Sequence, residues 1–152
     1  MNMRTLLLFA SLCVAWPATV RAGVDEHECS LATLRGGFAF TFTGTAHTPD
    51  GPSPRAGIGR LEFDGHGNLV GTNTTNADGI VLRRTLVGTY TVEADCTGSI
   101  AITFTDEVGG QGTFDVVIDD DGTEYRTVTT PPLDAVNPVT LTSVGRKQFS
   151  HR

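Results

Sequence analysis

The sequence has no excess of positive charge, which excludes several classes of partner. Lysine and arginine together number 11, against 17 aspartate and glutamate residues, so that the formal net charge is −6 at pH 7. A protein that neutralises nucleic-acid phosphates or anionic lipid headgroups needs a basic surface. The chain also shows no sustained heptad pattern and no collagen-like glycine period. We therefore expect a globular protein that binds no nucleic acid and, once processed, no membrane.

Motifs for metal, phosphate or nucleophilic chemistry are lacking as well. The sequence contains no GxSxG motif, P-loop or dinucleotide fingerprint. Its four histidines show neither HxH nor HExxH spacing, and His66 lies in a glycine-flanked turn, where we expect it in solvent. Residues 64–68 and 119–124 carry oxygens of the kind that calcium prefers, but fewer than the roughly six to eight ligands it needs. We expect no metal and no cofactor.

The first 22 residues are organised like a secretory signal peptide. Arg4 supplies a positive charge, residues 6–16 form a largely apolar run, and Val20 and Ala22 place small or short side chains before a cleavage site. The run is shorter than the about 20 residues that a membrane-spanning helix needs. We predict cleavage after Ala22 and a secreted or periplasmic protein, with a retained anchor as the alternative. Cleavage removes two arginines and no acidic residue, which changes the net charge from −6 to −8.

Cysteine is scarce, and after this cleavage two of the three cysteines remain, Cys29 and Cys96. An exported protein folds in an oxidising compartment, where two such thiols are expected to pair. A disulfide between positions 67 apart in the sequence would stabilise the fold by about 4 kcal/mol in the chain-entropy model. It would hold an N-terminal arm, residues 23–35, on the body of the protein. A redox or nucleophilic thiol is the alternative, but the chain has no CxxC motif.

From Gly36 onward, apolar and polar residues alternate with the period of two that is typical of strands, and turn signals interrupt them. The proline-rich segment 48–54 is predicted to be a loop, and the Thr/Asn-rich segment 69–76 an exposed or edge strand. Apart from a possible turn near residues 30–35, no helix is expected. The predicted strands lie at about residues 38–43, 57–64, 69–76, 80–92, 100–105, 114–119, 123–130 and 139–146.

Eight strands joined mostly by short turns predict an all-β fold, an antiparallel up-and-down barrel of the calycin-like kind. A β-sandwich would show the same alternation and is the alternative. Gly57 and Gly59 lie on the same strand face as Leu61 and Phe63, and they favour the barrel because tight coiling at a corner needs positions without a side chain. We expect a single domain over residues 36–147, followed by a tail at 148–152.

Two hairpin segments carry a resemblance to known proteins: residues 59–69, GRLEFDGHGNL, and residues 88–98, GTYTVEADCTG. They resemble a group of small secreted bacterial proteins whose barrels look like the allene oxide cyclase barrel. The similarity covers about residues 36–147 and consists of turn and strand signatures, so it implies a fold more than an activity. Barrels of this kind are cyclases, isomerases, a secreted phenazine demethylase or lipocalin-like carriers. None of their catalytic residues matches a position in this chain.

Arg84 interrupts an otherwise apolar strand face. Strict alternation places it on the same face as Leu82 and Leu86, where an unpaired guanidinium is costly. A bulge at Arg83–Arg84 would turn both side chains outward. Otherwise Arg84 extends to the rim, or it points into the lumen and meets a carboxylate or carbonyl of a ligand. Tyr90 and Tyr125 are either core residues with a satisfied hydroxyl or hydrogen-bonding groups of the lumen.

Three functions are compatible with these features. The first is a binding module that holds one small hydrophobic molecule in its lumen. The second is a cofactor-free enzyme of the cyclase, isomerase or demethylase type, in which lumen groups act as acid, base or oxyanion partner. The third is a structural or inhibitory protein whose barrel is filled by its own side chains. We predict the first, because no acid/base pair is visible, with Arg84 as the polar contact. The predicted apolar lining is Phe40, Phe42, Phe63, Leu86, Tyr90, Phe104 and Phe114.

Overall fold

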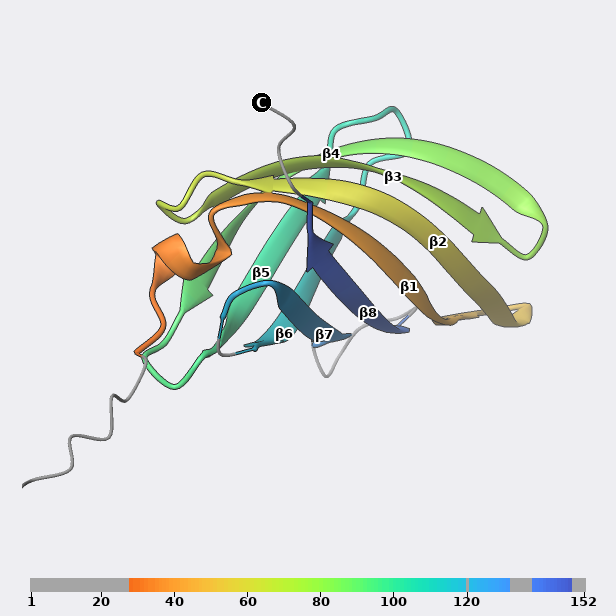
Figure 1. Cartoon of the computed structure of the whole chain (residues 1–152). Coiled ribbons are helices and arrows are strands. Elements are labelled where there is room, and N and C mark those ends of the chain that lie inside the picture. The colour runs from red at the N-terminus through yellow and green to blue at the C-terminus, as the bar shows by residue number, and fades with distance from the viewer. Residues whose placement is uncertain (1–27, 120, 132–137, 149–152) are drawn as a thin grey trace, which may run out of the picture.

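The computed structural model describes residues 28–119, 121–131 and 138–148, which form a closed β-barrel (Figure 1). Eight antiparallel strands follow one another in chain order, and β1 pairs with β8 to close the barrel. The predicted up-and-down barrel is confirmed, and the sandwich alternative is wrong. The strands are β1 (Gly36–Thr48), β2 (Gly51–Phe63), β3 (Asn68–Ala77), β4 (Ile80–Val92), β5 (Thr97–Phe104), β6 (Gln111–Ile118), β7 (Glu124–Thr129) and β8 (Val139–Lys147).

A short 3-10 helix, η1 (Leu31–Leu34), precedes β1, where the sequence indicates a helical turn. The predicted signal peptide at residues 1–22 lies outside the described residues, as do residues 23–27 of the predicted arm and 149–152 of the tail. Within the described ranges, no helix is long and apolar enough to cross a membrane.

The first hairpin is longer than predicted. Residues 48–54 are not a loop, because β1 ends at Thr48 and β2 begins at Gly51, which places Pro52 and Pro54 within a strand. Strand β2 pairs with β3 only from Arg55 onward, so the two prolines have a strand partner on the β1 side alone. His47, the partner of Pro52, donates its amide to the Pro138 carbonyl instead of to β2. The missing proline N–H groups therefore interrupt no strand ladder.

Strand β3 is not an edge, although its composition suggests one. It lies between β2 and β4, and every strand of a closed barrel has two neighbours. Its polar residues Asn73 and Thr75 are 9% and 6% exposed, because they face the interior of the barrel and not solvent. The expectation of an exposed or edge strand is wrong because it equates polar side chains with exposure to solvent.

The registers of neighbouring strands align inward-facing residues in rows around the barrel. One row runs from Asn73 through Gly59, Phe40 and Gly145 to Tyr125, across five adjacent strands. A Cβ atom at Gly59 would collide with the Phe40 ring, and a Cβ atom at Gly145 would collide with the Tyr125 ring. Glycine on the inner face thus makes room for the aromatic side chains of the adjacent strands, which agrees with the corner role predicted for Gly59.

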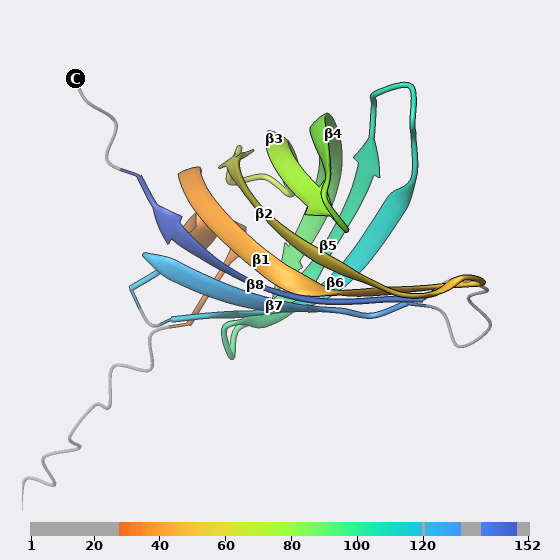
Figure 2. The same cartoon turned by 90° about the vertical axis from the view of Figure 1, so that its right-hand side faces the viewer.

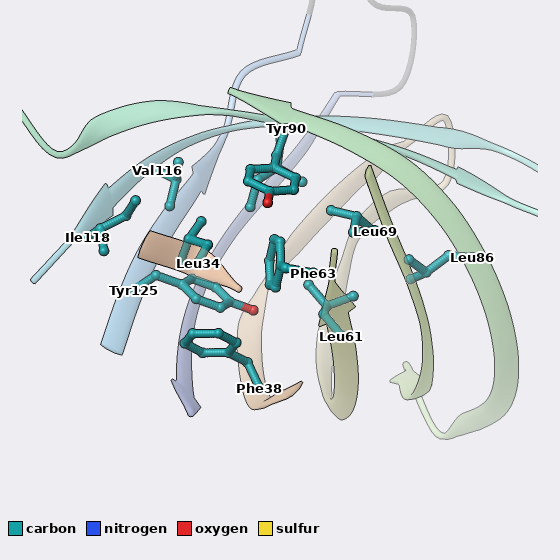
Figure 3. Packing of buried hydrophobic residues seen from close by; sticks show 11 residues of the cluster. Leu34, Phe38, Leu61, Phe63, Leu69, Leu86, Tyr90, Val116, Ile118 and Tyr125 are labelled. Atoms are coloured by element: carbon teal, nitrogen blue, oxygen red, sulfur yellow. The ribbon is translucent and has the colours of Figure 1, made fainter. Parts of the chain in front are cut away.

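One end of the barrel, which we call the plugged end, is closed by η1 and a packed core (Figure 3). The Phe63 ring packs edge-to-face against Tyr90, with ring centroids 5.0 Å apart, and against Phe38 at 5.5 Å. Leu34 of η1 is fully buried in this core, and the Tyr90 hydroxyl donates a hydrogen bond of 2.9 Å to the Leu31 carbonyl. Helix η1 therefore contributes both an apolar side chain and a backbone acceptor to this end.

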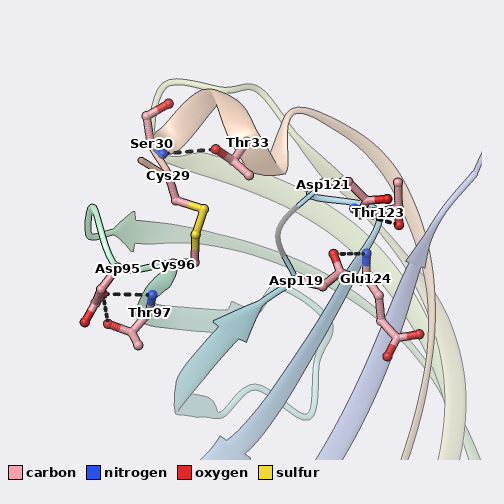
Figure 4. Close-up of a disulfide and its surroundings, with 10 residues drawn as sticks. All are labelled: Cys29, Ser30, Thr33, Asp95, Cys96, Thr97, Asp119, Asp121, Thr123 and Glu124. Carbon is pink, nitrogen blue, oxygen red and sulfur yellow. Dashed lines mark hydrogen bonds between the residues drawn. A yellow bond between two sulfur atoms is a disulfide. The ribbon is translucent and has the colours of Figure 1, made fainter. Parts of the chain in front are cut away.

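The predicted cysteine pair holds the segment before η1 in place (Figure 4). The sulfur atoms of Cys29 and Cys96 lie at disulfide distance, with the Cα atoms 5.0 Å apart. The Cys29 amide also donates a hydrogen bond to the Ala94 carbonyl at 3.1 Å. The pair connects the start of the described chain with the turn between β4 and β5.

Aspartate side chains close three turns at the plugged end. Asp64 accepts hydrogen bonds from the backbone and side chain of Asn68 and from the backbone of His66, which lower the pKa of Asp64 to about 2. Asp95 and Asp121 each accept from the amide and hydroxyl of the threonine two positions later (Figure 4). The oxygens of Asp64 and Asp121, considered above as calcium ligands, are thus engaged within hairpin turns.

Candidate ligand-binding lumen

The end of the barrel opposite the plugged end, which we call the mouth, leads into an internal cavity of about 240 Å³. Residues of all eight strands line the cavity, and Figure 2 shows how these strands are arranged, with β2 between β1 and β3. Most of the apolar side chains of the lining come from β1, β4, β5 and β6, and Leu61, Val139 and Leu141 come from β2 and β8. Those from β1, β4, β5 and β6 are Phe40, Phe42, Leu82, Leu86, Ile100, Ile102, Phe104 and Phe114.

Most of the polar side chains of the lining come from the other strands. Those from β2, β3, β7 and β8 are Arg55, Asn73, Thr75, Tyr125, Thr127, Thr129 and Ser143, and β4 and β6 contribute Arg84 and Gln111. Some of them are satisfied within the protein. Thr127 and Ser143 share a hydrogen bond of 2.6 Å, and Thr129 bonds to the Val139 carbonyl at 2.7 Å.

Five of the seven residues predicted as the apolar lining do line the cavity: Phe40, Phe42, Leu86, Phe104 and Phe114. Phe63 and Tyr90 do not, and here the prediction needs correction. Both face the interior as predicted, but they belong to the packed core beneath η1, where the Tyr90 hydroxyl is bonded to Leu31. Alternation indicates which face of a strand is inward, but it does not indicate how far the plug extends along the barrel axis.

Arg84 is inward-facing but not unpaired. The register of β3 and β4 runs without interruption through Arg84 and Arg83, so there is no bulge at this point. The Arg84 guanidinium, in a side chain that is 12% exposed, donates to the Asp106 carboxylate at 2.8 and 3.0 Å and also to the Gly109 carbonyl. It lies 3.6 Å from the centroid of the Phe104 ring. Arg84 therefore lines the cavity with its charge already compensated by the β5–β6 loop.

This ion pair has an electrostatic consequence for the loop. The hydrogen bonds from Arg84 hold the pKa of Asp106 below its usual value, so that the carboxylate stays charged at neutral pH. Asp106 also accepts the backbone amides of Val108 and Gly109 at 3.0 and 3.1 Å. One side of the mouth is thus shaped by a single carboxylate and the arginine that faces it.

Three buried polar atoms have no hydrogen-bond partner among the described residues: Arg55 Nε, Asn73 Oδ1 and the Tyr125 hydroxyl. All three residues line the cavity. Tyr125 is 1% exposed, and burial raises the pKa of its hydroxyl, which keeps the group neutral. Because buried polar groups in folded proteins are nearly always paired, such a concentration around one cavity is unusual.

Sequence reasoning missed Arg55 and Asn73 for different reasons. Arg55 lies between the loop predicted at residues 48–54 and the strand predicted at residues 57–64, although continuing the alternation back from Phe63 and Leu61 through the glycines places it on the inward face. Asn73 was assigned to a solvent-exposed strand because of its polar neighbours. In both cases the alternation of inward and outward residues predicts the correct orientation, but composition was given more weight.

The cavity lining offers little for acid/base or metal chemistry. Among the described residues that line it there is no histidine, aspartate or glutamate. In the part of the chain that the structure describes, no group of three or more His, Cys, Asp and Glu side chains could hold a metal ion. The groups available to a ligand are therefore neutral hydrogen-bonding side chains and arginine.

A broader depression of about 970 Å³ lies over β8 and β1 to β4 and includes outward-facing side chains of these strands. Its outer arginines are exposed, and Arg60 and Arg146 are paired with Glu62 and Glu124. Most of its wall residues face solvent, and so it does not enclose a ligand as the lumen does. We therefore consider the lumen the candidate site.

No family model and no curated protein matches this chain. Among solved structures it is similar to a redesigned β-barrel, mFAP1, bound to DFHBI, with a TM-score of 0.54 and 17% identity over 77% of this chain and 97% of that one. It is similar to EF1p2_mFAP2b bound to DFHBI, with a TM-score of 0.54 and 16% identity over 76% and 94%. A further redesigned β-barrel gives a TM-score of 0.55 and 18% identity over 78% and 95%. At these identities the similarity shows a β-barrel fold alone.

Proposed function

We propose that this protein is a secreted or periplasmic barrel that binds one small, mainly apolar molecule in its lumen. The observation that carries the proposal is the cavity of about 240 Å³ with a mainly apolar lining and a few polar groups. Small-molecule sites combine these features, and their volumes usually lie between about 300 and 1,000 Å³. The cavity therefore suits a compact ligand, such as one with a single ring or two fused rings.

Two further observations support the proposal. Two of the similar barrels are described as bound to DFHBI, so the fold can hold a small dye. Cys29 and Cys96 lie at disulfide distance, which fits folding in an oxidising compartment and the export predicted from residues 1–22.

Native mass spectrometry of the protein purified from its own host tests the proposal directly, because a bound small molecule would add a defined mass. A second test uses naphthalene as the probe, measured by equilibrium dialysis. Ile102→Trp fills the lumen and should abolish binding, whereas Ala101→Trp, on the outward face of the same strand, should bind like the wild type. Equal binding by both variants, or no binding by the wild type, would favour the packed barrel.

The second candidate is a cofactor-free enzyme of the cyclase, isomerase or demethylase type, which the resemblance to allene oxide cyclase-like barrels implies. The unpartnered groups of Arg55, Asn73 and Tyr125 favour it, because such groups can stabilise negative charge that develops on a substrate oxygen. The lack of a carboxylate or histidine in the lining favours the binder. Release of a chemically unchanged host ligand supports the binder, and conversion of that ligand on incubation with fresh protein supports the enzyme.

A further inference from the structure

The lumen contains two arginines whose electrostatic situations differ. Arg84 is fully engaged, with Asp106 as its counter-ion and Phe104 beneath its guanidinium. Arg55 forms no ion pair and no side-chain hydrogen bond within the described ranges, and its Nε is a buried donor without an acceptor. The described residues of the cavity lining include no carboxylate that could neutralise it. The Arg55 side chain is only partly buried, but its charge has no counter-ion among the described residues, so Arg55 favours the entry of an anion into the cavity.

The other two unpartnered groups of the lumen are neutral. The Asn73 side chain makes no hydrogen bond to a described residue and can offer its carbonyl or, after rotation, its NH₂ group. The Tyr125 hydroxyl can donate or accept, and it is buried in the same row of inward residues as Asn73. Each is more than nine-tenths buried and lines the cavity. These groups can hydrogen-bond a polar ligand atom without adding charge of either sign.

The polar and apolar groups of the cavity come mainly from different strands. Arg55, Asn73 and Tyr125 come from β2, β3 and β7, whereas the apolar side chains come mainly from β1, β4, β5 and β6. A ligand that satisfies both sets of groups is amphipathic, with a polar group on an apolar body. The apolar side chains alone would accept a hydrocarbon, but a hydrocarbon would leave the polar groups without partners.

We propose that the lumen is selective for a small apolar carboxylate and that Arg55, not Arg84, binds the carboxylate group, with Asn73 and Tyr125 as neutral partners. This inference rests on the proposed function and names the chemical class of its ligand. It replaces the prediction from sequence that Arg84 is the polar contact, because the charge and most hydrogen bonds of Arg84 are used by the β5–β6 loop. Charge-assisted hydrogen bonds to a planar carboxylate are the interaction that a guanidinium makes best.

Three probes with the same ring system test the proposal: naphthalene, 1-naphthoate and 1-naphthylmethylammonium. Their dissociation constants are measured by equilibrium dialysis on the oxidised, processed protein at neutral pH. We expect 1-naphthoate to bind at least about tenfold more tightly than naphthalene, and the ammonium compound to bind most weakly. Arg55→Met retains the aliphatic stem and should remove the preference for 1-naphthoate while the affinity for naphthalene is unchanged.

Arg60→Met is the matched control, because it removes the same charge from the outward face of the same strand. It should retain the preference for 1-naphthoate. Arg55→Gln serves as a second variant should Arg55→Met fail to fold. Tyr125→Phe should weaken 1-naphthoate severalfold and leave naphthalene unaffected, which separates recognition from a general effect on the cavity.

The outcomes separate this inference from the proposed function. If naphthalene binds as tightly as 1-naphthoate, or if Arg55→Met retains the preference, the inference is overturned and the binding function stands. If none of the three probes binds to the wild-type protein, the binding function fails and the inference fails with it. Loss of the preference in Arg55→Met but not in Arg60→Met supports the inference.

Discussion

The packed core and the cavity of this barrel are built from the same alternating strands, yet their buried polar groups differ in whether they are paired. In the core at the plugged end, the Tyr90 hydroxyl donates to the Leu31 carbonyl. The Tyr125 ring packs in the same core, against Phe38 and Phe63, but Tyr125 also lines the cavity, and its buried hydroxyl has no partner among the described residues. The two tyrosines therefore differ because η1 supplies an acceptor to Tyr90 and no described residue supplies one to Tyr125. An alternating strand produces a core or a cavity according to what closes the end of the barrel.

The turns and loops at the two ends of the barrel are also stabilised by different interactions. The plugged end combines a cysteine pair at disulfide distance with turns closed by Asp64, Asp95 and Asp121. At the mouth, the β5–β6 loop depends on the ion pair between Arg84 and Asp106. The cysteine pair and the three aspartate-closed turns thus lie at the plugged end, whereas an ion pair holds the β5–β6 loop at the mouth.

The largest effect is expected from the cysteine pair, which anchors the plug. Replacing both cysteines, Cys29→Ser with Cys96→Ser, should lower the free energy of unfolding by about 4 kcal/mol, because the unfolded chain gains the freedom of a long open loop. Urea denaturation of the oxidised protein and the double variant measures the difference. A loss below about 1 kcal/mol would mean that packing alone holds the plug, and reduction of the wild-type protein is the control.

The second comparison truncates one leucine at each end. Leu34→Ala should cost about 2–5 kcal/mol because it opens a cavity in a fully packed core. Leu82→Ala should cost less, about 1 kcal/mol, because Leu82 is only partly buried and already borders a cavity. Urea denaturation gives both values. Equal losses would show that the two ends are packed alike.

The third comparison removes one hydroxyl at each site. Tyr90→Phe should lower the free energy of unfolding by about 1 kcal/mol, because the Leu31 carbonyl loses its donor. Tyr125→Phe should leave stability unchanged or raise it slightly, because the buried hydroxyl has no partner among the described residues. Both values come from urea denaturation of the ligand-free protein. A clear decrease in the free energy of unfolding of Tyr125→Phe would show that the Tyr125 hydroxyl has a hydrogen-bond partner.

The smallest effect is a dependence on pH of the β5–β6 loop at the mouth. Since Arg84 lowers the folded-state pKa of Asp106, the contribution of this carboxylate is complete above the unfolded value of about 3.9. It is lost as the pH falls through the lower folded-state value. The Val108 and Gly109 amides donate hydrogen bonds to the Asp106 carboxylate. Their hydrogen exchange should therefore become faster in acid, relative to the intrinsic exchange rate.

Asp106→Asn is the control for this last prediction. Its amide side chain does not titrate, so the acid-dependent change in protection at Val108 and Gly109 should disappear. If the variant loses protection of these amides in acid to a comparable extent, another titrating group causes the change.

Much of the barrel was predictable because strands have a period of two. The strand predicted over residues 80–92 coincides with β4, and the inward faces of β5 and β6 were identified correctly. Pairing of Cys29 with Cys96 followed from the number of cysteines left after the predicted cleavage. The errors arose where composition was given more weight than alternation, as at Pro52 and Pro54 and in the polar strand β3.

The sequence by itself determined which side chains face inward, because that property depends on the backbone geometry of one strand at a time. Only the tertiary structure decided how far along the barrel each side chain lies. That position depends on the register between strands and on η1, so that Phe63 lies in the plug and Phe40 beside the cavity. The tertiary structure also decided that Arg84 meets Asp106, 22 positions away, and that Arg55 is left without a counter-ion among the described residues. Such pairings join segments distant in the sequence, and no local pattern records them.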